Sequence, residues 1–150
     1  MTASPPALRW SHVALNCADQ AATEAFYRRW FGMERAREVP LGNSSIVFLR
    51  LGTAYLELFP ALESGRTAEA DGPRETGVAR HLAFQTDDLD AFLGRLDETV
   101  ALTLGPLAFD EVIPGWRSVW LLDPDGVVVE VSQGYQDEGS TPPPCDHLSA

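Results

Sequence analysis

The stretch His81-Leu82-Ala83-Phe84-Gln85-Thr86-Asp87-Asp88 repeats, nearly position for position, the earlier stretch His12-Val13-Ala14-Leu15-Asn16-Cys17-Ala18-Asp19. Both alternate as a half-buried strand does, and both end in an aspartate suited to cap a helix. A second pair of similar stretches consists of residues 54–59 and 127–132, in which Glu57 and Glu130 lie among apolar neighbours. His12 lies 45 residues before Glu57, and His81 lies 49 before Glu130. We infer a duplication in which each half carries one early histidine and one late glutamate.

The segments between these repeated stretches predict the same order of secondary-structure elements in both halves. The first half reads as a strand (9–17), a helix (19–31, with Ala22, Phe26 and Trp30 at helical spacing) and three strands (33–39, 45–51, 53–59). The second half reads as a strand (80–86), a helix (87–99), a strand within 100–112 and strands 117–122 and 127–132. The sequence therefore predicts an α+β fold made of two tandem β-α-β-β-β modules.

The domain boundaries follow from composition. We expect an N-terminal extension (1–8), one domain (9–134) and a flexible tail (135–150) in which His147 is only a weak ligand candidate. Within the domain, module one spans 9–60 and module two spans 79–134. The small, polar and acidic residues of 61–78 predict a linker or an active-site lid.

Charge and cysteine content exclude several classes of partner. The net charge is −11, and all 11 basic residues are arginines, which argues against binding to nucleic acid or anionic membranes and removes lysine chemistry. No apolar run is long enough to cross a membrane, and the first residues do not resemble a signal peptide. Cys17 and Cys145 form no disulfide framework. A cytoplasmic location is therefore expected.

The alternation of the strands places the four polar residues on one face. Aliphatic side chains flank each histidine and glutamate and belong to the opposite face of the sheet. A buried carboxylate needs a cation, a metal or water, whereas a one-sided sheet would leave Glu57 and Glu130 in solvent. Because the set is matched across the duplication, we favour a site for one divalent transition metal formed by His12, Glu57, His81 and Glu130. Nickel, zinc, manganese, cobalt and iron all suit such ligands.

At these residues the chain resembles the vicinal oxygen chelate superfamily, the group of glyoxalases, bleomycin-resistance proteins and extradiol dioxygenases. The resemblance covers about residues 10–134. It implies a curved mixed sheet around a metal-binding cavity, with ligands on the first and fourth strands of each module. These positions are His12, Glu57, His81 and Glu130, a set similar to that of bacterial glyoxalase I. We also expect a homodimer that binds a small-molecule substrate.

The resemblance leaves several activities open, and the ligand set ranks them. A metal-dependent lyase or isomerase that moves a proton next to a carbonyl fits best. An extradiol dioxygenase uses two histidines and one carboxylate, so Glu57 would fill a position that it keeps open. Fosfomycin-modifying transferases hold their substrate in a cationic pocket, for which this chain has no lysine. A non-catalytic, ligand-sequestering protein of the bleomycin-resistance kind would not need the four ligands.

The resemblance and the strand parity together assign further roles. By parity the metal-facing side also receives Asn16, Gln85, Tyr55, Phe59 and Val128; the amides and aromatic rings among them either bind the substrate or satisfy strand ends and fill a dimer seam. Trp116 and Trp120 either line the mouth of the site or belong to the core. Glu130 matches the family's proton-transferring glutamate, and Glu57 is the alternative base. Glyoxalase I has an arginine at the position of Asn16 to hold the glutathione carboxylate, so we expect weak or no turnover of the glutathione hemithioacetal.

Overall fold

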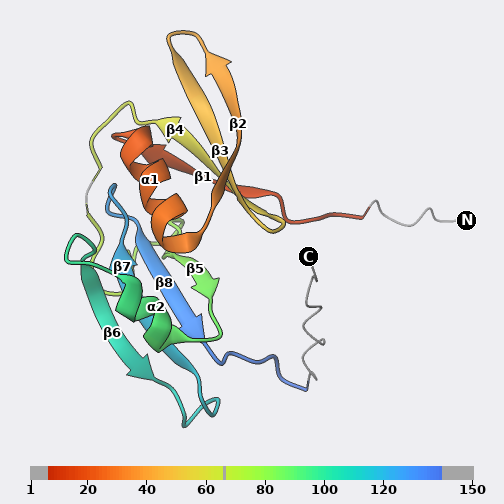
Figure 1. Ribbon diagram of the computed structural model, residues 1–150, viewed down its shortest axis with the longest axis vertical. Helices are drawn as coiled ribbons and strands as arrows, with labels where there is room; N and C mark the ends of the chain where they lie inside the picture. The colour runs from red at the N-terminus through yellow and green to blue at the C-terminus, as the bar shows by residue number, and fades with distance from the viewer. Residues whose placement is uncertain (1–6, 66, 140–150) are drawn as a thin grey trace, which may run out of the picture. The chain divides into compact units, whose positions relative to one another are not determined.

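The computed structural model describes residues 7–65 and 67–139, which form two β-α-β-β-β modules (Figure 1). Module one consists of β1 (His12–Cys17), α1 (Gln20–Phe31), β2 (Glu34–Leu41), β3 (Ser44–Leu51) and β4 (Ala54–Pro60). Module two consists of β5 (Leu82–Gln85), α2 (Leu89–Arg95), β6 (Leu102–Ala108), β7 (Arg117–Leu122) and β8 (Val128–Gln133). The predicted α+β fold and its order of elements are confirmed.

Each module forms its own four-stranded mixed sheet. The strand orders are β1-β4-β3-β2 and β5-β8-β7-β6, so the first strand of each module lies at an edge. In both sheets the first strand runs parallel to the fourth, and the other neighbours are antiparallel. This parallel pairing brings the early histidine strand directly beside the late glutamate strand.

The chain divides into two compact units that do not follow the modules at every residue. Unit 1 contains module one together with the turn Asp123–Val127 between β7 and β8. Unit 2 contains the rest of module two. The turn is held in unit 1 because Asp123 and Asp125 accept hydrogen bonds from the hydroxyls of Tyr27 (2.9 Å) and Thr23 (2.5 Å).

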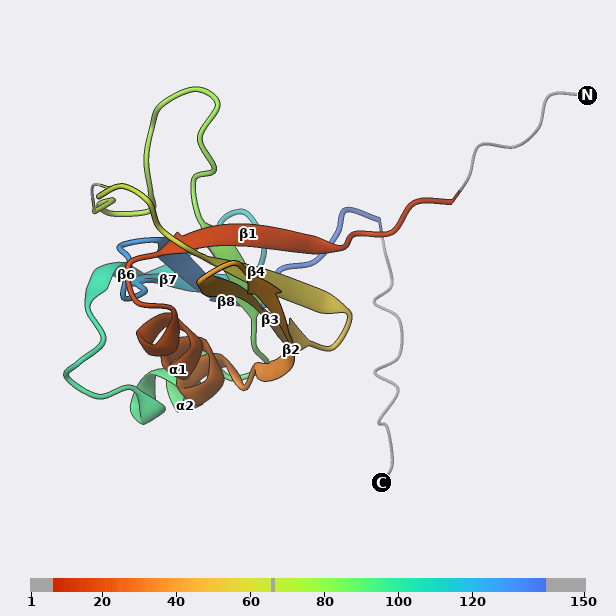
Figure 2. The same ribbon diagram turned by 90° about the horizontal axis from the view of Figure 1, so that it is seen from above.

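Helix α1 lies on one side of the first sheet, where its buried residues differ from those predicted (Figures 1 and 2). Trp30 is buried as expected, but Thr23 and Tyr27 are the residues with no exposed surface, while Ala22 is exposed. The spacing of apolar residues did not predict the burial of Thr23 and Tyr27, because each side chain carries a polar hydroxyl. Their hydroxyls can be buried because Asp123 and Asp125 accept from them.

The ends of α1 agree with the predicted capping residues, whereas α2 ends earlier than predicted. The Asp19 carboxylate accepts from the N–H groups of Ala21 and Ala22, and Gly32 ends α1 with a φ of 66°. Helix α2 is shorter than predicted, because Leu96 adopts an extended conformation with a ψ of 144°. None of the described helices is long and apolar enough to span a membrane.

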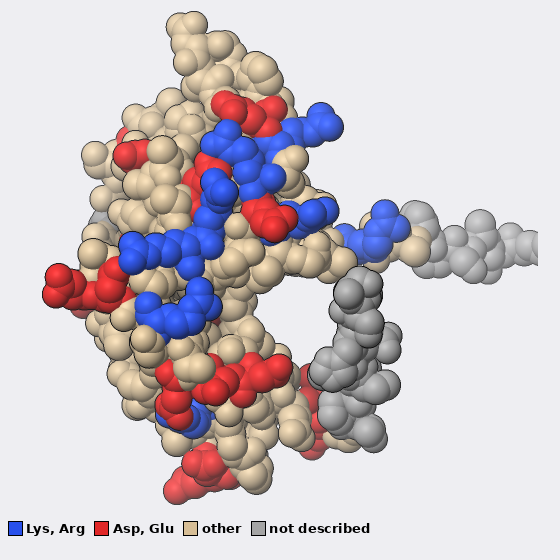
Figure 3. Space-filling view, in the orientation of Figure 1, with Lys and Arg blue, Asp and Glu red and all other residues tan. Residues whose placement is uncertain are grey.

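Basic and acidic side chains lie next to one another on the face of unit 1 seen in Figure 3. Glu24, 8% exposed, is the buried member of this network and pairs with Arg35 and Arg28. Hydrogen bonding to Arg35, against the opposing effect of burial, lowers the pKa of Glu24 below its usual value of 4.5. Its carboxylate therefore stabilises the fold when it is ionised.

We predict that Glu24→Gln lowers the free energy of unfolding by about 1 kcal/mol at neutral pH, a value discounted because Arg35 is partly exposed. A carboxylate with a lowered pKa contributes stability above its unfolded pKa and loses it as the pH falls through its folded pKa. The difference between wild type and variant should thus shrink below pH 4.5. Urea unfolding at several pH values measures it, with Glu34→Gln as an exposed control; a difference independent of pH would contradict the assignment.

Candidate metal centre

In unit 1 the pairing of β1 with β4 brings His12 to Glu57. The register sets His12 beside Tyr55 and Ala14 beside Glu57, so the two side chains are diagonal neighbours on one face. Nε2 of His12 lies 3.1 Å from Oε2 of Glu57. The glutamate side chain is 16% exposed, and the histidine side chain is 40% exposed.

In unit 2 the same arrangement recurs with closer contacts. Nε2 of His81, the residue just before β5, lies 2.8 Å from Oε2 of Glu130, and their side chains are 22% and 13% exposed. The Ser118 hydroxyl donates a hydrogen bond of 2.6 Å to Oε1 of Glu130. Trp120 is the cross-strand neighbour of Glu130 and meets the His81 ring edge-on at 6.5 Å.

The predicted division of the strands into two faces is confirmed in both units. Leu56 and Leu58 are 5% and 0% exposed, and Val129 and Val131 are 0% and 2% exposed. In each unit the histidine and the glutamate share the face opposite to these aliphatic residues. Both carboxylates are largely shielded from water. Neither glutamate therefore points freely into solvent, and each finds its nearest basic partner in the predicted histidine.

The other predicted site residues share these faces but differ in burial. Asn16 and Gln85 are exposed near the ends of β1 and β5, while Tyr55 and Phe59 on β4 are half-buried. Tyr55 also lines a groove of about 830 Å³ in unit 1 beside the segment Ala7–Ser11. Their role in binding a substrate stays a prediction.

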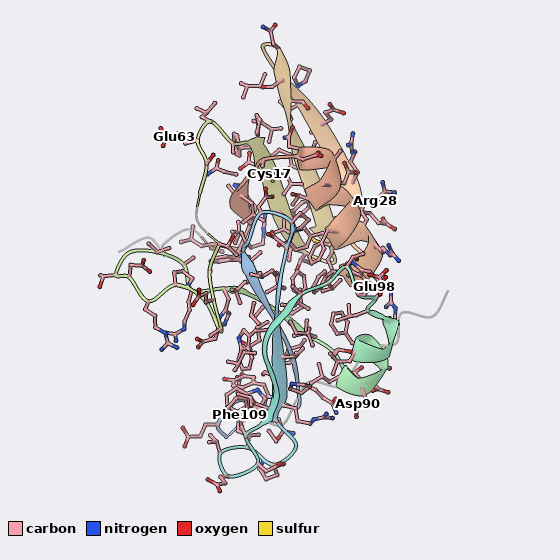
Figure 4. All side chains as sticks on the ribbon, turned by 90° about the vertical axis from the view of Figure 1, so that its left-hand side faces the viewer. Cys17, Arg28, Glu63, Asp90, Glu98 and Phe109 are labelled. Carbon is pink, nitrogen blue, oxygen red and sulfur yellow. The ribbon has the colours of Figure 1, made fainter. Side chains whose placement is uncertain are left out.

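The two tryptophans whose placement the sequence left open belong to one aromatic cluster in unit 2. Phe109, labelled in Figure 4, contacts both Trp116 and Trp120. Trp120 is only 6% exposed and is therefore a core residue. His147, the weak ligand candidate of the tail, lies outside the described residues.

Sequence reasoning missed two residues that hold the second pair in place. Ser118 precedes Trp120 by two positions on β7, so strand parity puts it on the face of Glu130 and could have found it. Asp71 touches His81 through its backbone carbonyl, 2.7 Å from Nδ1. No sequence signal marks such a contact, because every residue has a carbonyl.

The donor atoms of these pairs fit a divalent transition metal. The carbonyl of Asp71 can only accept, so Nδ1 of His81 carries the hydrogen, and Nε2 faces Oε2 of Glu130. A nitrogen lone pair and a carboxylate oxygen at 2.8 Å need a shared proton or a cation. Within the described residues no group of three or more potential ligands is gathered, and each unit holds one imidazole beside one carboxylate.

Comparison with protein families gives one match. The model described as the Glyoxalase/Bleomycin resistance protein/Dioxygenase superfamily matches residues 9–131. The chain belongs to this superfamily. This is the vicinal oxygen chelate group that the His and Glu motifs resembled, so that identification is confirmed. A comparison with curated proteins gave no match.

Several solved structures share the fold of this chain. A glyoxalase family protein from Enterococcus faecalis is 29% identical, with a TM-score of 0.63 over 83% of this chain and 97% of its own. A glyoxalase/dioxygenase from Nostoc punctiforme is 26% identical, with a TM-score of 0.65 over 91% of this chain and 98% of its own. TnmS3, an antibiotic binding protein from Streptomyces sp. CB03234, is 22% identical, with a TM-score of 0.65 over 88% of this chain and 100% of its own. Proteins described as a glyoxalase family protein, as a glyoxalase/dioxygenase and as an antibiotic binding protein thus share this fold.

One potential nucleophile of unit 1, Cys17, lies apart from its His–Glu pair. Cys17 ends β1, is 1% exposed and is labelled in Figure 4. Burial raises the pKa of its thiol to about 12, with a further contribution from the neighbouring Asp125. It is therefore a protonated core residue rather than a reactive thiolate.

We predict that Cys17 resists alkylation in the folded protein. At pH 9 a thiol with a pKa near 12 is ionised in about one molecule in a thousand, and burial hinders the reagent as well. Iodoacetamide labelling of Cys145→Ser, followed by mass spectrometry, should show no modification until urea unfolds the chain. Rapid labelling of the folded variant would show that the thiol is accessible and activated.

Proposed function

We propose that this superfamily member is a metal-dependent, glyoxalase-like lyase or isomerase that acts on a small oxygenated substrate by proton transfer. The observation that supports this most strongly is the matched contact between a histidine Nε2 and a glutamate Oε2 in both units. A structural ion pair needs no such duplication. Two imidazoles and two carboxylates would together complete the protein ligands of one metal.

The ligands in this proposal are His12, Glu57, His81 and Glu130. Nickel, zinc, manganese, cobalt and iron all accept mixed nitrogen and oxygen ligands of this kind. A bound divalent ion would act as a Lewis acid toward two neighbouring oxygens of the substrate. The shielding of both carboxylates favours this use, since a buried carboxylate requires a positive partner.

We assign the proton transfer to Glu130, with Glu57 as the alternative. The Ser118 hydroxyl donates to Oε1 of Glu130, which restrains the carboxylate while Oε2 faces Nε2 of His81. Glu57 has no comparable hydroxyl partner among the described residues, and Ile46 on β3 stands where symmetry would require one. A fixed carboxylate can accept a proton at one defined position.

Four residues would contact the substrate: Asn16, Gln85, Tyr55 and Phe59. They combine two amides with two aromatic rings, which suits a small molecule with oxygen atoms at one end. Asn16 offers no fixed charge, so we do not expect a glutathione conjugate to be the preferred substrate.

Metal analysis tests the ligand assignment. Wild-type protein dialysed against nickel, zinc, manganese, cobalt or iron(II) should retain one ion per set of four ligands by mass spectrometry. His81→Ala should weaken binding by more than about 100-fold, because even the loss of an outer partner costs 10- to 100-fold. His147→Ala is the matched control. A folded His81→Ala variant that keeps all of its metal would show that the assignment is wrong.

Solvent exchange tests the base. Hydroxyacetone incubated with metal-loaded protein in deuterated water should exchange its α-hydrogens, as followed by NMR. Glu130→Gln should keep most of the metal and lose about 100-fold or more of the exchange rate, in the range expected for a general base. Exchange that survives in Glu130→Gln and vanishes in Glu57→Gln would assign the base to Glu57. Oxygen consumption by iron-loaded protein, without exchange in any variant, would favour a dioxygenase, and metal-free ligand binding would favour a sequestering protein.

A further inference from the structure

The histidine of unit 2 is held by a turn that lies ten residues earlier in the chain. Nδ1 of His81 is 2.7 Å from the backbone carbonyl of Asp71. Since the carbonyl has no hydrogen to give, the hydrogen must sit on Nδ1. Nε2 is then the nitrogen left to face Glu130. A carbonyl in this position selects the tautomer that a metal at Nε2 requires.

The side chain of Asp71 keeps that carbonyl in place. Its carboxylate accepts hydrogen bonds from Nε and a terminal nitrogen of Arg80, at 3.0 and 2.8 Å, and from Arg74 at 3.0 Å. Before it, the carbonyl of Ala70 accepts a hydrogen bond of 2.6 Å from the hydroxyl of Thr103 on β6. The turn is therefore tied both to the residue that precedes His81 and to the sheet.

Gly72 allows the turn to approach the backbone ahead of His81. Its φ is +117°, and a Cβ added there would lie 1.7 Å from the carbonyl oxygen of Arg80. That separation is far inside a van der Waals contact, and the partner is backbone. Only glycine fits while the Asp71 carbonyl stays within reach of the His81 ring.

The first pair is supported differently. Among the described residues, Nδ1 of His12 meets the hydroxyl of its neighbour Ser11, at 2.8 Å. A hydroxyl can donate or accept, so it does not select a tautomer. The His12 side chain is also nearly twice as exposed as that of His81, at 40% against 22%. The two halves of the duplication therefore differ in how firmly their histidines are oriented.

We propose that the Ala70–Gly72 turn is a positioning element that fixes the tautomer and orientation of His81, which makes His81 and Glu130 the pre-organised half of the metal centre. Asp71 is the central positioning residue of this turn, and glycine is needed at position 72 because a Cβ there would collide with the backbone of Arg80. The inference rests on the proposed metal function for its consequence, but the hydrogen position can be tested without metal. It also gives a role to part of the segment predicted as a linker or lid.

The test combines NMR of metal-free protein with metal titration. In protein labelled with ¹⁵N-histidine, the wild-type His81 ring should show a protonated Nδ1 that is protected from exchange, with the resonance assigned by its absence in His81→Gln. Gly72→Ala should lose this signal and bind zinc about 10- to 100-fold more weakly. Gly77→Ala is the matched control: Gly77 lies in the same segment with a positive φ of 84°, but a Cβ there meets nothing within 4 Å. It should leave both readouts at wild-type values.

A second variant covers the case in which Gly72→Ala does not fold. Asp71→Ala adds no atoms and removes the hydrogen bonds from both arginines, so it should weaken the Nδ1 signal and zinc binding in the same direction. Asp71→Asn, which keeps an acceptor for Arg80, should recover part of both.

Different results would contradict the positioning role of the turn and the proposed metal function. A wild-type His81 that carries its hydrogen only on Nε2 overturns the positioning role. So does a folded Gly72→Ala or Asp71→Ala variant with an unchanged ring signal and unchanged zinc affinity. Wild-type protein that binds no zinc or other transition metal contradicts the proposed function, while the ring signal still decides whether the turn orients His81.

Discussion

The cost of removing a carboxylate from water is the constraint on which the candidate centre depends. Glu57 and Glu130 occur in strands whose neighbouring residues are buried, and their own side chains are 16% and 13% exposed. A carboxylate in such a place requires a positive or hydrogen-bonding partner. The parallel pairing of the first strand with the fourth supplies one, because it sets the histidine of one strand diagonally beside the glutamate of the other.

Both units hold this pairing, but the residues around it differ. In unit 2, Ser118 and the Asp71 carbonyl hold Glu130 and His81 from either side. In unit 1 the corresponding strand position carries Ile46, and the histidine meets a neighbouring serine. If the pairs bind metal, as proposed, the histidine of the second pair is already oriented by a carbonyl, whereas His12 meets a hydroxyl that does not select its tautomer. Such a division lowers the entropic cost of forming one half of the site.

A different polar cluster stabilises unit 1. Asp123 accepts hydrogen bonds from the hydroxyl of Tyr27 and from the N–H groups of Asp125 and Val127, all at 2.9 Å. Burial raises the pKa of Asp123 in spite of these donors. The cluster explains why the turn Asp123–Val127 belongs to unit 1 although its flanking strands belong to unit 2. It also explains why α1 buries a threonine and a tyrosine where a purely apolar stripe was predicted.

The sequence by itself determined the two modules, the order of their elements and the face on which each histidine and glutamate lies. These properties depend on local periodicity: side chains alternate along a strand, aspartate and glycine mark helix ends, and a duplication repeats both. Only the tertiary structure decided that Nε2 of each histidine contacts its glutamate, that Ser118 donates to Glu130 and that Asp71 orients His81. Strand register, the burial of hydroxyls on α1 and a hydrogen bond to a backbone carbonyl depend on which distant segments meet, and no residue type records that meeting.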